Sequence, residues 1–94
     1  MKILAIEREI KGVSWENSSE LLREEAKHVY QLYLADILRE IYFNEKKCAI
    51  LVLETQDMKS AKEVLDNLPL VKSGMIEFEI MELRPYTGFD RLSE

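Results

Sequence analysis

The sequence predicts an α+β fold whose elements follow one another in the order β-α-β-β-α-β. Two observations predict it: two short runs are apolar on both faces, as central strands are, and two longer segments repeat apolar residues at helical spacing. A chain of 94 residues with 47% hydrophobic residues can build one core but not two. We therefore expect residues 1–94 to form one domain, with residues 88–94 as a tail.

The first half of the chain is expected to form a strand, a loop and a helix. Residues 2–8 are apolar on both faces along most of their length, and residues 12–19 follow with small and polar side chains around Trp15. A helix is expected over residues 18–35, with Asn17 as its N-cap. Its buried stripe is predicted to consist of Leu22, Ala26, Val29 and Tyr33.

Two strands and a shorter helix are expected next. Residues 37–43 alternate, which predicts a strand with Arg39, Ile41 and Phe43 on one face. Residues 44–47 form a polar turn, and residues 48–53 are the most hydrophobic run of the chain and should form the other central strand. Asp57 is expected to cap a second helix that Pro69 ends.

The last predicted strand is half-buried, and it completes the topology. Ile76, Phe78 and Ile80 alternate with polar residues, so one face of this strand is apolar. Right-handed crossovers then leave a ferredoxin-like arrangement, a four-stranded antiparallel sheet with both helices on one face and the first and third strands in the middle. The other face of the sheet would remain apolar and uncovered. Burial of roughly 600–800 Å² there is the scale of a specific interface, so we predict a homodimer through the sheet faces.

Composition excludes several classes of function. Thirteen Lys and Arg against eighteen Asp and Glu give a net charge of -5, which argues against binding to nucleic acid or to an anionic membrane surface. The single cysteine, Cys48, cannot form an internal disulfide, and no apolar run has the roughly 20 residues of a membrane helix. A cytoplasmic protein is expected. One histidine and one cysteine cannot furnish a conventional zinc site, and no Gly-rich phosphate motif occurs.

Three stretches carry a family resemblance. Residues 39–42 (Arg-Glu-Ile-Tyr), 67–71 (Asn-Leu-Pro-Leu-Val) and 76–86, with Leu-Arg-Pro-Tyr at its end, resemble the muconolactone isomerase-like group of the dimeric α+β barrels. The resemblance covers roughly residues 20–88. It implies a ferredoxin-like subunit that pairs with a second copy and can associate further. It also implies chemistry on small unsaturated lactones without a metal or an organic cofactor.

One departure from the family concerns the second strand. The isomerases carry a Trp-Arg-His-Leu-Trp type of run there, and this chain has Leu38 to Tyr42 with Glu40 in place of the histidine. A group that titrates near neutrality is thereby replaced by one with an ordinary pKa of about 4.3. The fold can therefore be carried over, whereas the lactone isomerase reaction cannot.

Two residues are candidates for proton transfer. His28, the only histidine, would suit proton transfer next to a carbonyl; the alternative is a surface histidine on an amphipathic helix. Glu79, like Glu77, would become an acid–base group if the sheet face shields it from water. The alternative for both glutamates is a charged edge strand that resists aggregation.

Three further residues are candidates for substrate binding. Arg39 can bind a substrate carboxylate with two hydrogen bonds, or it can pair with Glu77 or Glu79. Trp15 can cover a ligand as a lid, or it can cap the core or the dimer rim. Tyr42 has the same two interpretations.

The sequence therefore leaves two functions open. The first is a small-molecule-binding homodimer with the character of a cofactor-independent isomerase, acting on a small organic acid or lactone. The second is a non-catalytic assembly or ligand-sensing module without an open active site. An open cavity of a few hundred Å³ that His28 or a shielded carboxylate reaches together with Arg39 would distinguish the first from the second.

Overall fold

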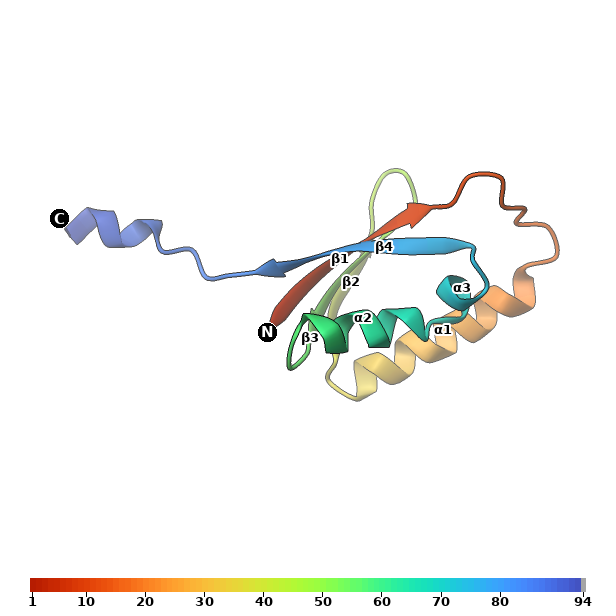
Figure 1. The fold of residues 1–94 in the computed structure, drawn as a ribbon, viewed down its shortest axis with the longest axis horizontal. Coiled ribbons are helices and arrows are strands. Elements are labelled where there is room, and N and C mark those ends of the chain that lie inside the picture. Colours follow the sequence, from red (N-terminus) through yellow and green to blue (C-terminus); the bar gives the residue numbers. More distant parts are fainter. Residues whose placement is uncertain (94) are drawn as a thin grey trace.

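The computed structural model describes residues 1–93 and contains one four-stranded sheet with helices on one of its faces (Figure 1). The elements are β1 (Lys2–Glu9), α1 (Ser19–Leu34), β2 (Leu38–Phe43), β3 (Ala49–Glu54), α2 (Met58–Asp66), α3 (Pro69–Lys72), β4 (Ile76–Leu83) and the 3-10 helix η1 (Gly88–Ser93). The strand order is β2-β3-β1-β4, and all three strand pairs are antiparallel. The predicted ferredoxin-like topology, with the first and third strands in the middle, is confirmed.

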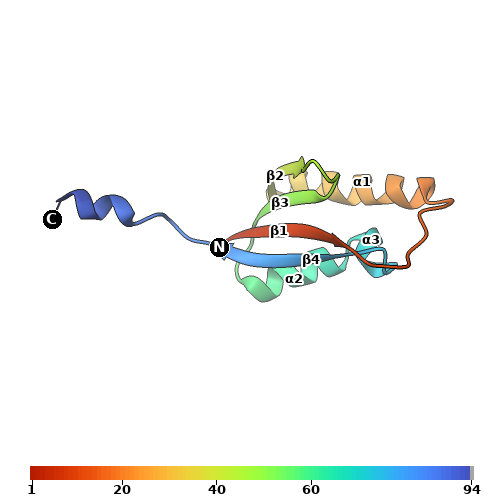
Figure 2. The ribbon, with the colours of Figure 1, turned by 90° about the horizontal axis from the view of Figure 1, so that it is seen from above.

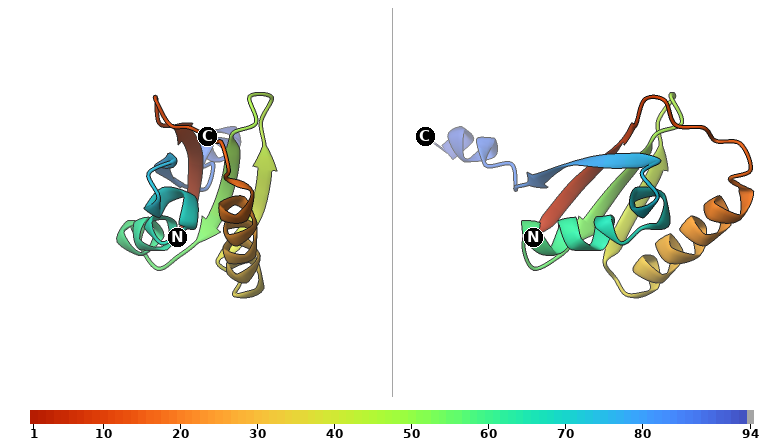
Figure 3. Two further views of the ribbon diagram at one scale, coloured as in Figure 1. Left: turned by 90° about the vertical axis from the view of Figure 1, so that its right-hand side faces the viewer. Right: turned by 45° about the vertical axis from the view of Figure 1, so that its right-hand side comes forward.

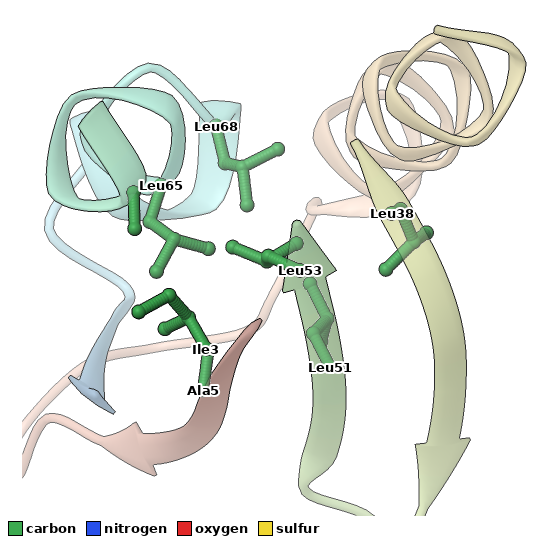
Figure 4. Packing of buried hydrophobic residues seen from close by; sticks show 8 residues of the cluster. Ile3, Ala5, Leu38, Leu51, Leu53, Leu65 and Leu68 are labelled. Carbon is green, nitrogen blue, oxygen red and sulfur yellow. The ribbon is translucent and has the colours of Figure 1, made fainter. Parts of the chain in front are cut away.

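The buried core lies between the sheet and α2. Ile3 of β1 pairs with Leu53 of β3, and Ala5 pairs with Leu51, so the four side chains form one layer. Leu65 of α2 and Leu68 close this layer from the helix side (Figure 4). The apolar side chains at every second strand position therefore pack against the apolar stripe of α2. The two-residue period of a strand and the 3.6-residue period of a helix each place such side chains on one face.

The start of α2 matches the expected cap. The Asp57 carboxylate accepts a hydrogen bond of 2.7 Å from the backbone N–H of Ser60. This bond holds the pKa of Asp57 below its ordinary value, because it stabilises the charged form. Helix α2 ends at Asp66, before Pro69, and Pro69 begins the short helix α3, so the prediction that Pro69 ends the second helix is wrong. The fixed φ of proline suits the first position of a helix.

Helix α1 differs from the expectation in two ways. Its N-cap is Ser18, whereas Asn17 lies in the loop with a φ of 56°, so the prediction that Asn17 caps the helix is wrong. No residue of α1 is fully buried, and Leu22 and Tyr33 are 44% and 58% exposed. Ala26 is exposed as well, so the predicted buried stripe is wrong at three positions and only Val29 is half-buried, because α1 inclines away from the sheet instead of lying flat on it (Figure 3).

Strand β2 contains an irregularity that the alternation could not predict. Leu38 pairs with Leu53 and Glu40 pairs with Val52, so Arg39 is an extra residue in a β-bulge. The bulge brings Leu38 onto the same side of the sheet as Ile41 and Phe43, and leaves Arg39 exposed. The regular alternation that the sequence predicts is therefore interrupted at Arg39, whereas Ile41 and Phe43 remain on one face.

The sheet face opposite the helices is apolar at its centre. Leu4, Ile6, Ile50 and Met81 point to this face because each alternates with a core residue, and each is half-buried. Charged side chains surround them, among them Arg8 and Glu79 in an ion pair of 2.6 Å. We call this surface the open sheet face.

The chain beyond β4 leaves the body of the protein. Residues 84–93, which we call the C-terminal arm, extend past the end of the sheet and finish in η1 (Figure 1 and Figure 2). The principal extents are accordingly 59 × 27 × 20 Å. None of the helices within residues 1–93 has the length and apolar character needed to cross a lipid bilayer.

Candidate functional site

A cleft of about 840 Å³ lies between α1 and the sheet. Helix α1 approaches the sheet at its C-terminal end and moves away from it toward its N-terminal end (Figure 3). Side chains from α1, the sheet and α3 line the resulting space, and most of them are apolar. They include Val29, Leu51, Leu70, Phe78 and the exposed Tyr30, Ile41 and Phe43.

The closed end of the cleft is fixed by the turn after α1. The backbone N–H of Ile37 donates to the carbonyl of Leu32, and that of Asp36 donates to the carbonyl of Tyr33. With Asp36 at a φ of 62°, these bonds form a Schellman motif that leads directly into the buried Leu38. The helix is therefore anchored at one end, and the cleft widens toward the other.

Three carboxylates line the cleft, and each accepts one hydrogen bond from an N–H group. Glu7 accepts from the backbone N–H of Ala49 at 2.9 Å, and Glu9 accepts from the indole N–H of Trp15 at 2.9 Å. Glu25 of α1 accepts from the backbone N–H of Leu70 at 2.9 Å. A single N–H engages one oxygen, so the second oxygen of each carboxylate remains available to a ligand.

Glu25 has the most perturbed environment of the three. It is half-buried, and burial raises its pKa above the ordinary value because the charged form loses hydration. The nearby negative charge of Glu7 raises the pKa further, whereas the Leu70 N–H and the charge of His28 lower it. A carboxyl group whose pKa is raised in an apolar cleft holds its proton more readily than one in water, which suits a group that exchanges protons with a ligand.

Trp15 and the β2–β3 turn lie at the wide end of the cleft. Trp15 is half-buried, lines the cleft and is held there by its hydrogen bond to Glu9. Lys46, Lys47 and Cys48 of the turn also line the cleft. Asn44 shapes this turn, since its side-chain oxygen accepts hydrogen bonds from the backbone N–H groups of Lys46 and Cys48.

The structure does not bring the five predicted site residues together. Trp15 lines the cleft, whereas His28 is exposed on α1 and does not line it. Arg39 is exposed, and its Nε donates to the carbonyl of Asp36 at 2.8 Å. Tyr42 and Glu79 lie on the open sheet face, where Tyr42 donates to Glu40 at 2.9 Å and Glu79 pairs with Arg8. The Glu40 carboxylate raises the pKa of Tyr42.

Two of the cleft carboxylates, which the sequence interpretation missed, do have a signal in the sequence. Glu7 lies two residues beyond Ala5, hence on the face of β1 that builds the core. Glu25 lies four residues before Val29, within the row of α1 residues that turns toward the sheet. A charged residue at a position that belongs to an apolar row points to a site. Burial of a charge costs free energy, and such a position is kept where the charge binds a partner or takes part in chemistry.

Within residues 1–93, no three histidine, cysteine, aspartate or glutamate side chains are grouped so that they could hold a metal ion.

Comparison with known proteins supports the fold. No protein-family model matches the chain, and no curated protein sequence matches it. Among solved structures, the chain is similar to 5-chloro-2-hydroxyhydroquinone dehydrochlorinase from Burkholderia phenoliruptrix AC1100, in complex with 2,5-dihydroxybenzoquinone. The TM-score is 0.64 at 14% sequence identity, over 94% of this chain and 98% of that chain. At this identity the likeness shows a shared ferredoxin-like fold.

Proposed function

We propose that this protein binds a small, largely apolar organic molecule in the cleft between α1 and the sheet. The observation that carries the proposal is a cleft of about 840 Å³ that is lined mostly by apolar side chains and contains a few hydrogen-bonded carboxylates. Binding sites for small molecules have this size and this mixture of an apolar lining with few polar groups. The complex of the dehydrochlorinase with 2,5-dihydroxybenzoquinone offers an unsaturated ring as the first ligand class to test.

We further propose an isomerase-like proton transfer in which Glu25 is the base. The Glu25 carboxylate would take a proton from a carbon next to a carbonyl and return it to another carbon of the same molecule, so no co-reactant is consumed. Lys46 and Lys47 at the wide end are suited to the carboxylate of an organic acid. A small unsaturated organic acid or lactone meets both requirements.

His28 remains the alternative base, because it lies three positions from Glu25 on α1. Arg39, Tyr42 and Glu79 would take part only in a site that a second copy completes, since Tyr42 and Glu79 lie on the open sheet face. The role of His28 as a base and the roles of Arg39, Tyr42 and Glu79 in a two-chain site stay predictions until variants test them.

The muconolactone isomerase-like resemblance and the open sheet face together support a homodimer. An apolar centre of Leu4, Ile6, Ile50 and Met81 inside a charged rim has the anatomy of a protein interface. We propose that two copies bury this face against each other, as in a dimeric α+β barrel.

Ligand binding tests the cleft directly. Titration with 2,5-dihydroxybenzoquinone or an anilinonaphthalene sulfonate dye should change the fluorescence of Trp15, the only tryptophan, which lines the cleft. Ala26→Phe should weaken binding at least 10-fold, because Ala26 also lines the cleft. Gln31→Phe adds the same group at an exposed position of α1 outside the cleft lining and should leave binding unchanged. Equal affinities for the two variants would refute the proposed site.

Proton transfer is tested by hydrogen–deuterium exchange at carbon. In D₂O, the wild type should exchange a C–H of muconolactone or a related unsaturated acid, and Glu25→Gln should slow this exchange at least about 100-fold. Glu24→Gln is the matched control, because Glu24 is exposed and pairs with Lys27 at 3.3 Å. If His28→Gln abolishes exchange and Glu25→Gln does not, His28 is the base. Binding without exchange by any of the proteins would favour the ligand-sensing function.

A further inference from the structure

The cleft contains negative charge that no cation of the described chain neutralises. The carboxylates of Glu7, Glu9 and Glu25 line it, and each accepts a hydrogen bond only from an uncharged N–H group. The ion pairs within residues 1–93 all involve other carboxylates, namely those of Glu24, Glu54, Asp66, Glu79 and Glu82. A charge in an apolar space is costly unless an opposite charge pairs with it.

Two of these carboxylates face the same space from opposite walls. Glu7 lies on β1 and is held by the N–H of Ala49, and Glu25 lies on α1 and is held by the N–H of Leu70. Both are half-buried. Burial is the main cause of the raised pKa of Glu25, and the charge of Glu7 raises that pKa further, so the two carboxylates are close enough to repel each other. A positive charge between them would remove this repulsion.

The lysines of the cleft do not supply that charge. Lys46 and Lys47 lie in the exposed β2–β3 turn at the wide end, and neither forms an ion pair within residues 1–93. Water and salt screen exposed charges of this kind. The positive charge that suits the space between Glu7 and Glu25 therefore has to come with the ligand.

The walls of the cleft are suited to an organic cation. Aromatic side chains from α1, the sheet and the loop before α1 line it, namely Trp15, Tyr30, Tyr33, Phe43 and Phe78. Phe78 of β4 pairs directly with Glu7 of β1, so this ring lies beside that carboxylate. The face of an aromatic ring attracts an ammonium group, and the apolar remainder of the ligand gains from the same walls. A metal ion would gain nothing from such walls, because it needs several oxygen ligands.

We propose that the ligand of the cleft carries a protonated amino group on its apolar body, and that Glu7 is the residue that selects it. The ammonium group donates to the carboxylate oxygen of Glu7 that the Ala49 N–H leaves free, beside the ring of Phe78. Glu25 faces the bound molecule from α1. This inference rests on the proposed function and deepens it, since it names the class of ligand.

An amine and an amino acid both supply this chemistry. Lys47 lies two residues before Ala49, whose N–H holds Glu7. A carboxylate attached close to the amino group can therefore meet Lys47 or Lys46 while the amino group meets Glu7. The amino group is thus compatible with the acid group that the two lysines suit, and the experiment distinguishes the two sources.

Calorimetric titration at pH 7 with four probes that share a phenyl ring tests the inference. The probes are 2-phenylethylamine, phenylalanine, 2-phenylethanol and 3-phenylpropionate. The protein should bind 2-phenylethylamine at least about 10-fold more tightly than 2-phenylethanol, because a charge-assisted hydrogen bond is roughly twice as strong as a neutral one. A higher affinity for phenylalanine than for 2-phenylethylamine identifies an amino acid as the source, and the reverse order identifies an amine.

Variants assign the preference to Glu7. Glu7→Gln keeps an acceptor for the Ala49 N–H but removes the charge, and should lower the affinity for the amine at least about 10-fold and that for the alcohol far less. Phe78→Leu removes the ring beside Glu7 and should also weaken the amine more than the alcohol. Glu24→Gln makes the same change of charge on the exposed side of α1 and should leave the preference intact.

Three results would overturn the inference: equal affinities for the amine and the alcohol, tightest binding of 3-phenylpropionate, or an amine preference that survives Glu7→Gln. The failure of the proposed function looks different. If 2-phenylethanol or the dye binds and Ala26→Phe weakens that binding, but the amine has no advantage, the cleft function stands and the inference about the amino group fails. If neither the dye nor any phenyl probe binds, both proposals fail.

Discussion

The carboxylate of Glu25 on α1 accepts a hydrogen bond of 2.9 Å from the backbone N–H of Leu70, 45 residues later in the chain. This bond connects the one helix that inclines away from the sheet to the short helix α3, on the far wall of the cleft. The same side chain is thus a structural acceptor and, in our proposal, the reactive group.

Glu25 variants should separate these two roles by stability. Glu25→Ala leaves the Leu70 N–H without its partner and should lower the free energy of unfolding by about 1–3 kcal/mol. Glu25→Gln keeps an acceptor oxygen and should avoid most of that loss. Urea unfolding at pH 7 measures both. Equal losses in the two variants would contradict the importance of the hydrogen bond.

The pH dependence of Glu25→Gln follows from the sign of the pKa change. Because the folded-state pKa of Glu25 is raised, its charged form destabilises the fold above the unfolded-state pKa, about 4.3. The wild type should lose stability relative to Glu25→Gln as the pH rises from about 4 through the folded-state pKa, and the difference should be constant beyond it. Urea unfolding between pH 4 and 8 measures this difference, and Glu24→Gln should not show it.

Asp57 should affect the pH dependence of stability with the opposite sign to Glu25. Its folded-state pKa is lowered by the Ser60 N–H, so its stabilisation is present above the unfolded-state pKa of about 3.9 and is lost as the pH falls through the folded-state pKa. Asp57→Ala should lower Tm by several degrees at pH 7, with a smaller effect in acid. Asp57→Asn caps without titrating and should stay close to the wild type at pH 7. Scanning calorimetry at pH 3 and pH 7 provides the comparison.

Asp36 should be replaceable by glycine with a gain in stability. Its φ of 62° lies in the left-handed region, where glycine pays no steric cost. Asp36→Gly should raise the free energy of unfolding by about 0.5–1 kcal/mol, and Asp36→Val should lower it by about 1–2 kcal/mol. Asp36→Asn removes the charge alone and shows how much of the gain is electrostatic. A stabilised valine variant would contradict the Schellman geometry.

A single added charge on the open sheet face should disrupt the proposed dimer. Ile6→Glu introduces a carboxylate at the centre of this face and should convert the proposed dimer into a monomer at micromolar concentration, because a buried unpaired charge is costly. Lys59→Gln changes the net charge by the same amount on an exposed position of α2, on the other side of the sheet. Light scattering after size exclusion gives the masses. A wild-type monomer would refute the dimer itself.

Most of the fold was predictable because it depends on local periodicity. The two strands that are apolar on both faces occupy the centre of the sheet, and the Asp57 cap and the 44–47 turn occur where their residue types favour them. The predictions for α1 and β2 were less accurate. The bulge at Arg39 and the exposure of Tyr33 depend on how distant segments pack, which alternation along the chain does not encode.

The candidate site was predictable only in part, and for a related reason. Trp15 lines the cleft as the lid interpretation required, although its role remains a prediction. Glu7 and Glu25 are brought together from β1 and α1, and their one signal in the sequence is a charge in phase with an apolar row. His28 and Glu79 were attractive by residue type, but they lie on separate surfaces.

By itself, the order of apolar and polar residues determined the strand order, the side of the sheet that the helices cover and the apolar character of the opposite face. Those properties follow from side-chain period, which each segment carries on its own. Only the tertiary structure decided the inclination of α1, and with it the cleft and the environment of Glu25. That inclination results from the anchor at Ile37 and Leu38 and the contact with Leu70, and such contacts arise only when segments far apart in the chain meet.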